Sequence, residues 1–440
     1  MAGGALEDAD CRQVSGSIRM APAARRFAAQ LAIALPELGW SVSETSIMPL
    51  LLKLDIPPVL LSANWLCSPV LGMLLHPLLG RLSDKHGRRP FVVVLGLASA
   101  IGLALMPTLA SAAGTAAGLA AFFLVFGIVD TSHDLLLTPT RAAMNDVYAP
   151  RESELRSAVA GGCGKVAALL GVVLLGGERA FAATAAIIVG VVFVQLLVPR
   201  APAIEDGART ADLPLAQAAQ VEEARTEDEA GTTTSSFPPG FAPIWVVSCG
   251  GWFAVCVLSF GITSAWAERS GALPDTPEFE RGVKLASVLL MGSTGSFIVS
   301  GGALPLLVRL AGGHFSALVI ALVAMATTMV SFASGCPDWA TAACIIVLYP
   351  PSYQIVANAP FGWLEEQPAF SASERGRLTG WFNSSLAVAQ AVTSVFTGPV
   401  VALAHGRIFA SFAVAAALCF AIAAATVVAA LCRRRREVGE

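Results

Sequence analysis

Residues 65–91 read WLCSPVLGMLLHPLLGRLSDKHGRRPF, an apolar run that ends in a short charged loop before a second apolar run begins. Between Arg89 and Asp130 lie 40 residues without Asp, Glu, Lys or Arg. A helix of about 20 residues crosses a hydrocarbon core of about 30 Å, so this stretch is long enough for a membrane span. Further uncharged stretches of that length cover residues 180–199, 285–308, 310–337, 339–364, 378–404 and 408–432.

The composition points the same way. Apolar residues make up 55% of the 440 residues and charged ones 13%, about half the share of a soluble domain. The mean hydropathy of +0.69 excludes soluble enzymes, secreted disulfide scaffolds and disordered chains. The nine cysteines have no metal or redox spacing, and no nucleophile elbow or P-loop occurs, so we expect neither an enzyme nor a metal site.

Proline, glycine and charge divide the chain into twelve expected helices. We place them near residues 27–52, 59–80, 90–110, 116–146, 156–176, 180–199, 243–267, 283–308, 314–334, 338–362, 375–400 and 406–432. Helices satisfy their own backbone in lipid, whereas open strands do not. We therefore expect an all-α membrane protein with twelve transmembrane helices in two six-helix bundles.

The placement of Lys and Arg predicts the orientation. With both termini in the cytoplasm, 21 of the 28 Lys and Arg residues fall on the cytoplasmic side, as the positive-inside rule requires. The polar segment 200–242 is too poor in apolar residues to fold, and it predicts a flexible acidic linker between the bundles. The expected domains are a cytoplasmic tail 1–26, a first bundle 27–199, the linker 200–242, a second bundle 243–432 and a basic tail 433–440.

Charged residues inside membrane spans are expensive, and they usually serve function. Glu37 and Glu44 share one face of the first helix, about 10 Å apart along its axis. Asp130 lies about halfway along the fourth helix, and we expect it to be functional; for Glu37 a structural hydrogen bond is the alternative. The remaining charges within the spans are Asp134, Arg141, Asp146 and Lys165. Among the five histidines, His133 lies one turn from Asp130 and is the candidate for a proton relay.

The loop GRLSDKHGRRPF, residues 80–91, resembles the G-x-L-x-D-x-x-G-R-R/K signature of the major facilitator superfamily, between its second and third spans. An ordinary basic loop that obeys topology is the alternative. The resemblance implies a loop that gates conformational switching. Its residues here are Gly80, Asp84, Gly87, Arg88 and Arg89.

Four segments narrow the resemblance to the glycoside–pentoside–hexuronide branch, which includes plant sucrose/proton symporters and animal proton-associated sugar transporters. They are ELGWSVSETSIMPLLLKLDIP (37–57), residues 65–91, DTSHDLLLTPTRAAMND (130–146) and GWFNSSLAVAQAVTSVFTGP (380–399). The third is similar to the family's D-x₈-P-x-R-A-x₃-D pattern, with Asp130 and Arg141 at the family spacing. The fourth is similar to G-x-x-N-x₆-Q-x₃-S-x₃-G-P.

The resemblance implies a proton-coupled symporter for sucrose or a related glycoside that works by alternating access. Asp130, Arg141 and Glu37 are then the candidates for proton coupling. Sugar sites combine amides or carboxylates with aromatic platforms. The candidates are Trp40, Asn64, Trp65, Asn358, Trp381, Asn383 and Gln390, with packing or interface anchoring as the alternative for each tryptophan.

Two other functions stay open. One is a facilitator or symporter for another small polar solute, and the other is a non-transporting membrane sensor. We expect no cofactor besides the proton gradient as driving force. The expected partners are a sugar, protons and membrane lipids, without nucleic acid. We expect a monomer in the plasma membrane rather than in an internal membrane.

Overall fold

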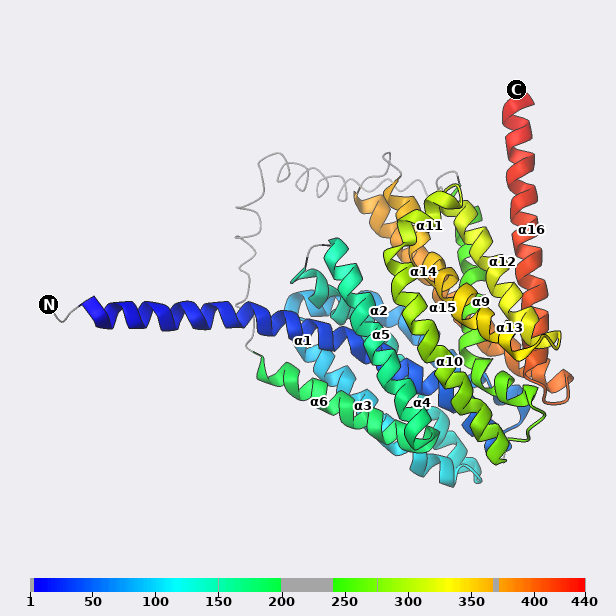
Figure 1. Cartoon of the computed structure of the whole chain (residues 1–440), viewed down its shortest axis with the longest axis horizontal. Helices are drawn as coiled ribbons and strands as arrows, with labels where there is room; N and C mark the ends of the chain where they lie inside the picture. The colour runs from blue at the N-terminus through cyan, green and yellow to red at the C-terminus, as the bar shows by residue number, and fades with distance from the viewer. Residues whose placement is uncertain (1–3, 149, 199–239, 275, 367–371, 440) are drawn as a thin grey trace.

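The computed structural model describes residues 4–148, 150–198, 240–274, 276–366 and 372–439, and these residues form helices and turns without a strand (Figure 1). Within them, eleven segments are long and apolar enough to cross a membrane. The first helix, α1 (Gly4–Lys53), is not among these segments, because Glu37 and Glu44 lower the hydropathy of its inner part. With α1 the fold has the twelve expected crossings.

The outer surface of the bundle is apolar. Leu74, Leu174 and Leu403 are 70%, 69% and 83% exposed, and they belong to a large set of exposed aliphatic side chains. Such a surface would aggregate in water and is suited to lipid. The protein is therefore a multi-pass integral membrane protein.

The first half of the chain forms one bundle. Two short 3₁₀ turns, η1 (Pro58–Leu60) and η2 (Ala63–Leu66), follow α1. The helices after them are α2 (Cys67–His86), α3 (Arg89–Ala112), α4 (Ala116–Asn145), α5 (Pro150–Leu175) and α6 (Gly177–Leu197). Helix α1 packs against α4, α5 and α6, while α3 packs between α4 and α6.

The second half forms a bundle around α9 (Phe241–Arg269), which packs against α10, α12, α15 and α16. The other elements are α10 (Pro277–Gly302), α11 (Leu304–Leu310), α12 (His314–Ala333), α13 (Asp338–Ala343), the π-helical turn η3 (Cys344–Leu348), α14 (Tyr349–Glu365), α15 (Ala372–Leu403) and α16 (Phe409–Gly439). Figure 1 shows the two halves beside each other, blue to teal and green to red.

Two helices run past their expected ends. Helix α1 begins at Gly4 rather than near residue 27, and α16 continues to Gly439 rather than ending near residue 432. Both extend beyond the bundles in Figure 1. Hydropathy marks where a helix leaves lipid, and a helix can continue into water. The expected linker 200–242 lies outside the described residues except for its last three.

Two expected spans are interrupted. The second span was expected to be one helix over 59–80, but it begins with the two 3₁₀ turns and becomes α-helical at Cys67. The tenth, expected over 338–362, is one span from Asp338 to Leu364, but it contains the π-helical turn. Pro350 and Pro351 follow that turn and have no N–H to donate to the preceding carbonyls, which explains the local widening.

The halves meet where α1 packs on α9, α5 on α10, and η1, η2 and α2 on α15. At the end of the molecule near the α1–η1 loop, Ser62 Oγ donates to the Ser394 carbonyl at 2.7 Å and accepts from the Gly398 amide at 2.9 Å. Thr263 Oγ1 donates to the Thr45 carbonyl at 3.2 Å. We call these five residues the closed end.

Gly398 permits the close approach at the closed end. A Cβ atom at this position would overlap the backbone carbonyl oxygen of Val59. Backbone atoms cannot rotate away as a flexible side chain can, so a larger residue would push η1 and α15 apart. The contact between the halves here therefore depends on a glycine.

Candidate functional site

Helix α4 carries a buried polar face near its middle. Asp130 and His133 are fully buried and Asp134 is 8% exposed. His133 Nε2 is hydrogen-bonded with Ser99 Oγ at 2.6 Å, and Asp134 Oδ2 lies 3.2 Å from His76 Nε2. Both carboxyl oxygens of Asp130 are buried without a hydrogen bond of good geometry among the described residues, and the Ser68 hydroxyl lies close enough to donate one. Such groups are rare in proteins, so Asp130 is well placed to bind a proton or a hydroxyl group.

The start of the second span adds further unpartnered polar atoms. The side-chain amide of Asn64 and the indole nitrogen of Trp65 are buried without hydrogen bonds to described residues, and the buried Ser68 hydroxyl lies near the Asp130 carboxyl group. This segment lies against α4, because the ring centroids of Trp65 and Phe126 are 4.9 Å apart. Buried polar atoms of this kind are normally paired with water or with a ligand.

Trp65 is a contact between the halves. Its ring stacks on Phe260 of α9, with centroids 4.3 Å apart and an interplanar angle of 8°. The side chain is 1% exposed. In this conformation Trp65 therefore acts as a packing residue, the alternative considered for each tryptophan.

The other residues expected to bind the substrate are more accessible. Asn358 is exposed, and its amide nitrogen donates to the backbone carbonyl and side-chain oxygen of Gln354 at 2.9 and 3.0 Å. Asn383 is exposed, and Gln390 and Trp40 are half-buried. Helices α14 and α15 carry the three amides, whereas Trp40 and Asn64 belong to the first half. The candidates thus come from both bundles.

Trp381 lies at a contact between α9 and α15. The indole nitrogen of Trp245 donates to the Trp381 backbone carbonyl at 2.8 Å, and the two rings meet edge to face at 6.4 Å. The Trp381 side chain is 44% exposed. Its accessible ring stays a candidate platform.

The three residues expected to couple protons do not form one cluster. Glu37 is half-buried, and its aliphatic carbons pack on Gly161 of α5. Arg141 is exposed on α4, and within the described part of the chain it forms no ion pair with Asp130 or Glu37. Eleven residues correspond to about 16 Å of helix, so a direct bond from Arg141 to Asp130 is not expected.

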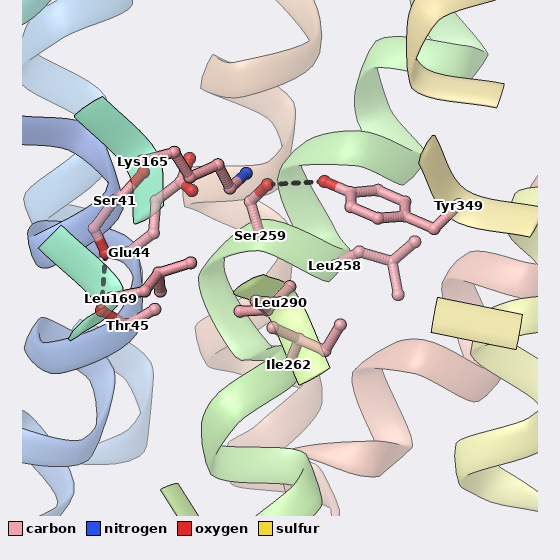
Figure 2. A pocket seen from close by; sticks show the side chains of 10 residues that line it. All are labelled: Ser41, Glu44, Thr45, Lys165, Leu169, Leu258, Ser259, Ile262, Leu290 and Tyr349. Carbon is pink, nitrogen blue, oxygen red and sulfur yellow. Dashed lines mark hydrogen bonds between the residues drawn. The ribbon is translucent and has the colours of Figure 1, made fainter. Parts of the chain in front are cut away.

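A small cavity lies between the two halves (Figure 2). Its volume of about 10 Å³ is close to the space that one water molecule needs. Residues of the first half that line it are Ser41, Glu44, Thr45, Lys165 and Leu169, and those of the second half are Leu258, Ser259, Ile262, Leu290 and Tyr349.

Two opposite charges face hydroxyl groups across this cavity. Glu44 and Lys165 project from α1 and α5, and in Figure 2 the Lys165 ammonium extends toward Ser259. The Ser259 hydroxyl is hydrogen-bonded with the Tyr349 hydroxyl at 3.1 Å. Among the described residues, Glu44 and Lys165 form no direct ion pair with each other. Both charges are therefore available to a polar ligand.

Sequence reasoning recognised Glu44 and Lys165 as charges within membrane spans, but it did not pair them. The sequence nevertheless indicates that Lys165 has such a partner, because a cation in a membrane span requires an anion or a wet cavity nearby. The α1 carboxylate that meets this requirement is Glu44, which lines the same cavity as Lys165. Glu37 instead packs on Gly161, one turn before Lys165.

An aromatic cluster near the cavity was not expected. Two of the three tyrosines of the chain, Tyr349 and Tyr353, lie one turn apart on α14, with ring centroids 6.2 Å apart. Trp252 of α9 meets Tyr353 edge to face at 5.6 Å. Trp252 and Tyr353 are only partly buried, so their rings can serve as a platform. The four-residue spacing of Tyr349 and Tyr353 in the sequence indicates that the two rings share one helix face.

The arginines of the α2–α3 loop connect it to neighbouring helix ends. Arg88 Nε lies 3.4 Å from an Asp146 carboxyl oxygen at the end of α4. Arg89 donates to the backbone carbonyls of Leu196 and Val198 at the end of α6. The loop is thereby tied to the bundle end opposite the closed end.

The remaining loop residues are two glycines, which act through the backbone, and Asp84. Gly87 ends α2 with φ of 84°, a conformation that favours glycine. Gly80 faces α4, where a Cβ atom would lie 3.9 Å from Thr138. The side chain of Asp84 lies outside the described residues.

The chain is similar to known proteins both as a family and as individual sequences. The family described as Major Facilitator Superfamily matches residues 25–361. Human proton-associated sugar transporter A is 35% identical over 133 residues, which are 27% of this chain and 18% of the human protein. Sucrose transport protein SUT3 of Oryza sativa subsp. japonica is 33% identical over 129 residues, or 25% of this chain and 26% of the rice protein. The matches thus span about a quarter or less of these relatives.

Solved structures resemble the fold over a much longer stretch. The nucleoside transporter NupG has a TM-score of 0.68 and 17% identity, covering 92% of this chain and 98% of NupG. A mutant of NupG has a TM-score of 0.72 and 15% identity, covering 92% and 99%. At this identity the likeness is one of fold.

The family match therefore covers well over half of the chain, and the twelve-helix architecture agrees with it. The protein is not an enzyme but a membrane transporter, and it belongs to the major facilitator superfamily.

Proposed function

We propose that the protein is a proton-coupled symporter for a sugar, sucrose or a related glycoside, that works by alternating access. The sequence relatives named for sugar and sucrose transport support the substrate class. The carboxyl group of Asp130, fully buried and without an ion pair or a hydrogen bond of good geometry among the described residues, is the observation that carries the coupling. A charged carboxylate without partners is costly in a bundle, whereas a protonated one can donate a hydrogen bond to a sugar hydroxyl.

Alternating access requires that the halves rock about a site between them. The cavity between α1, α5, α9, α10 and α14 has walls from both halves, so it would widen as they separate. Its present volume of about 10 Å³ is far too small for a sugar. A sugar therefore binds after this region has opened.

The charge asymmetry of the sequence supports an assignment of the closed end to the outside of the membrane. The conformation is then closed to the outside. The exposed side chains of Arg141, Asn358 and Asn383 support access from the cytoplasm. In this assignment Asp84, Arg88 and Arg89 belong to the cytoplasmic loop that gates switching.

The proposed transport cycle assigns a step to each of these positions. With the closed end open, Asp130 takes a proton from outside and hydrogen-bonds a sugar hydroxyl. Amides such as Asn358, Asn383 and Gln390 bind further hydroxyls, and the rings of Trp252 and Tyr353 pack on the apolar face of the sugar. Closure at Ser62 and Gly398 then exposes the sugar and the proton to the cytoplasm. Glu37 and Arg141, which do not contact Asp130 in this conformation, act as more distant charges that assist proton release.

The test is uptake of radiolabelled sucrose into proteoliposomes, with and without an imposed inward proton gradient. We expect accumulation above the outside concentration with the gradient and only equilibration without it. A panel of other glycosides and nucleosides tests the second candidate, a carrier for another small polar solute, which is favoured by the limited extent of the sugar-transporter matches. Uptake of a nucleoside without uptake of any sugar would contradict the proposal.

Topology gives a separate prediction. With both termini inside, a tag at residue 225 or 440 should be reached only from the cytosol, and one at residue 275 only from outside. The reason is the concentration of Lys and Arg in segments that would then be cytoplasmic. Antibody labelling of intact and permeabilised cells measures this. Protease cleavage at position 225 in intact cells would contradict the orientation.

A further inference from the structure

We propose that Glu44 and Lys165 form a charge-balanced pair in the transport pathway that makes the carrier select neutral solutes over charged ones. The inference rests on the proposed function and assigns the charge class of its substrate. Both side chains line the cavity between the halves. They are an acid and a base from neighbouring helices, α1 and α5, of the same half, and their charges balance when both are ionised.

The geometry leaves both charges free for a solute. Among the described residues neither takes part in an ion pair, although the two lie close enough to interact electrostatically. The opposite wall of the cavity contributes hydroxyl groups, from Ser259 and Tyr349, rather than charges. A solute entering between the halves thus meets one anion and one cation from the first half and neutral donors from the second.

The surrounding charges do not replace this pair. Glu37 acts on Glu44 electrostatically, but it packs on Gly161 and is not part of the cavity wall. Asp130 also interacts electrostatically with Glu44, but it lies on α4 and does not line the cavity. The cavity wall therefore has no net charge when Glu44 and Lys165 are both ionised.

Charge balance has a consequence for selectivity. A neutral sugar can bind hydroxyls to both groups and leave no net charge in the closed site. An acidic or amino sugar adds a net charge, which is costly to bury without a partner. Discrimination of this kind arises from unpaired charge in the wrong complex rather than from added contacts with the right one.

Removal of one charge should therefore change the preferred class of solute. Glu44→Gln leaves Lys165 unbalanced and should favour glucuronate, whereas Lys165→Met leaves Glu44 unbalanced and should favour glucosamine. The double variant has no charge at either position and should return to a neutral preference. Glu44→Asp and Lys165→Arg keep both charges and serve as matched controls.

The experiment measures inhibition of radiolabelled sucrose uptake in proteoliposomes by glucose, glucosamine and glucuronate. Relative to wild type, each single variant should improve inhibition by its matching charged sugar over glucose by about tenfold. The double variant and both controls should stay within about threefold of the wild-type ratio, since they keep the balance. A loss of packing alone would weaken inhibition by all three sugars to the same extent. The second substitution would not restore it.

Two outcomes separate the hypotheses. If wild-type protein takes up no sugar, the proposed function fails and this inference fails with it. If it takes up sucrose but the single variants keep the wild-type ratios, only this inference is overturned. If a single variant is unfolded after purification, the purification is repeated in the presence of each charged sugar. A ligand stabilises the folded state that binds it. Recovery with the matching sugar alone supports the pair, and recovery with neither overturns it.

Discussion

Asp130→Asn is expected to abolish sugar accumulation driven by a proton gradient while sugar binding persists. The amide has nearly the shape of the protonated carboxyl group and can still donate a hydrogen bond, but it cannot release a proton. The neighbouring acid on α4, Asp134, is paired with His76, so we do not expect it to take over the proton of Asp130. Uptake against a gradient should fall to the background of empty vesicles.

The matched control is Asp134→Asn, one turn further along α4. The Asp134 carboxylate is already paired with His76, which is hydrogen-bonded in turn with Thr138 at 2.7 Å, so we assign it a structural role. This variant should lose thermal stability but keep accumulation above equilibrium. Full accumulation by Asp130→Asn would remove Asp130 from the coupling mechanism and leave Glu37 as the next candidate.

Gly398→Ala is expected to slow transport by about tenfold or more, because overpacking a close contact typically costs about 1–3 kcal/mol. The added methyl group would overlap the Val59 carbonyl and separate the Gly398 amide from Ser62. The halves would then close at this end less often. The protein should instead stay open on that side, with sugar binding retained.

Cysteine labelling directly measures how far the closed end is open to the outside. Thr397→Cys places a thiol at a position that is 3% exposed, next to Gly398. In a background without reactive native cysteines, an impermeant reagent added outside should label it faster when Gly398→Ala is present. Gly190→Ala in α6 is the control, since a Cβ atom there meets nothing within 4 Å. Equal labelling rates in the three proteins would show that the closed end does not depend on Gly398.

The sequence was sufficient to predict the membrane-spanning helices, because a lipid bilayer restricts the length of such a helix and the number of charges in it. The uncharged run from Pro90 corresponds closely to α3 and the first part of α4. Helix ends beyond the membrane were not predictable from hydropathy, as α1 and α16 illustrate. Hydropathy does not predict the π-helical turn before Pro350, because Pro350 and Pro351 lie within an uncharged run long enough for one span.

The site was harder to predict because it depends on contacts between helices distant in sequence. Asp130 could be singled out from its depth in one helix. The pairing of Glu44 with Lys165 depends on how α1 crosses α5, and the approach of Tyr349 to Ser259 depends on how α14 packs on α9. Trp65 looked like a sugar platform, but its contact with Phe260 covers one ring face.

The most direct test of proton-coupled sugar symport is the pH of a weakly buffered medium around proteoliposomes when sugar is added. With wild-type protein oriented as proposed, sucrose or the preferred glycoside should draw protons inward, so the outside medium becomes more alkaline. With Asp130→Asn the same sugar should bind without a pH change. Sugar uptake by wild-type protein with no accompanying alkalinisation would contradict the account.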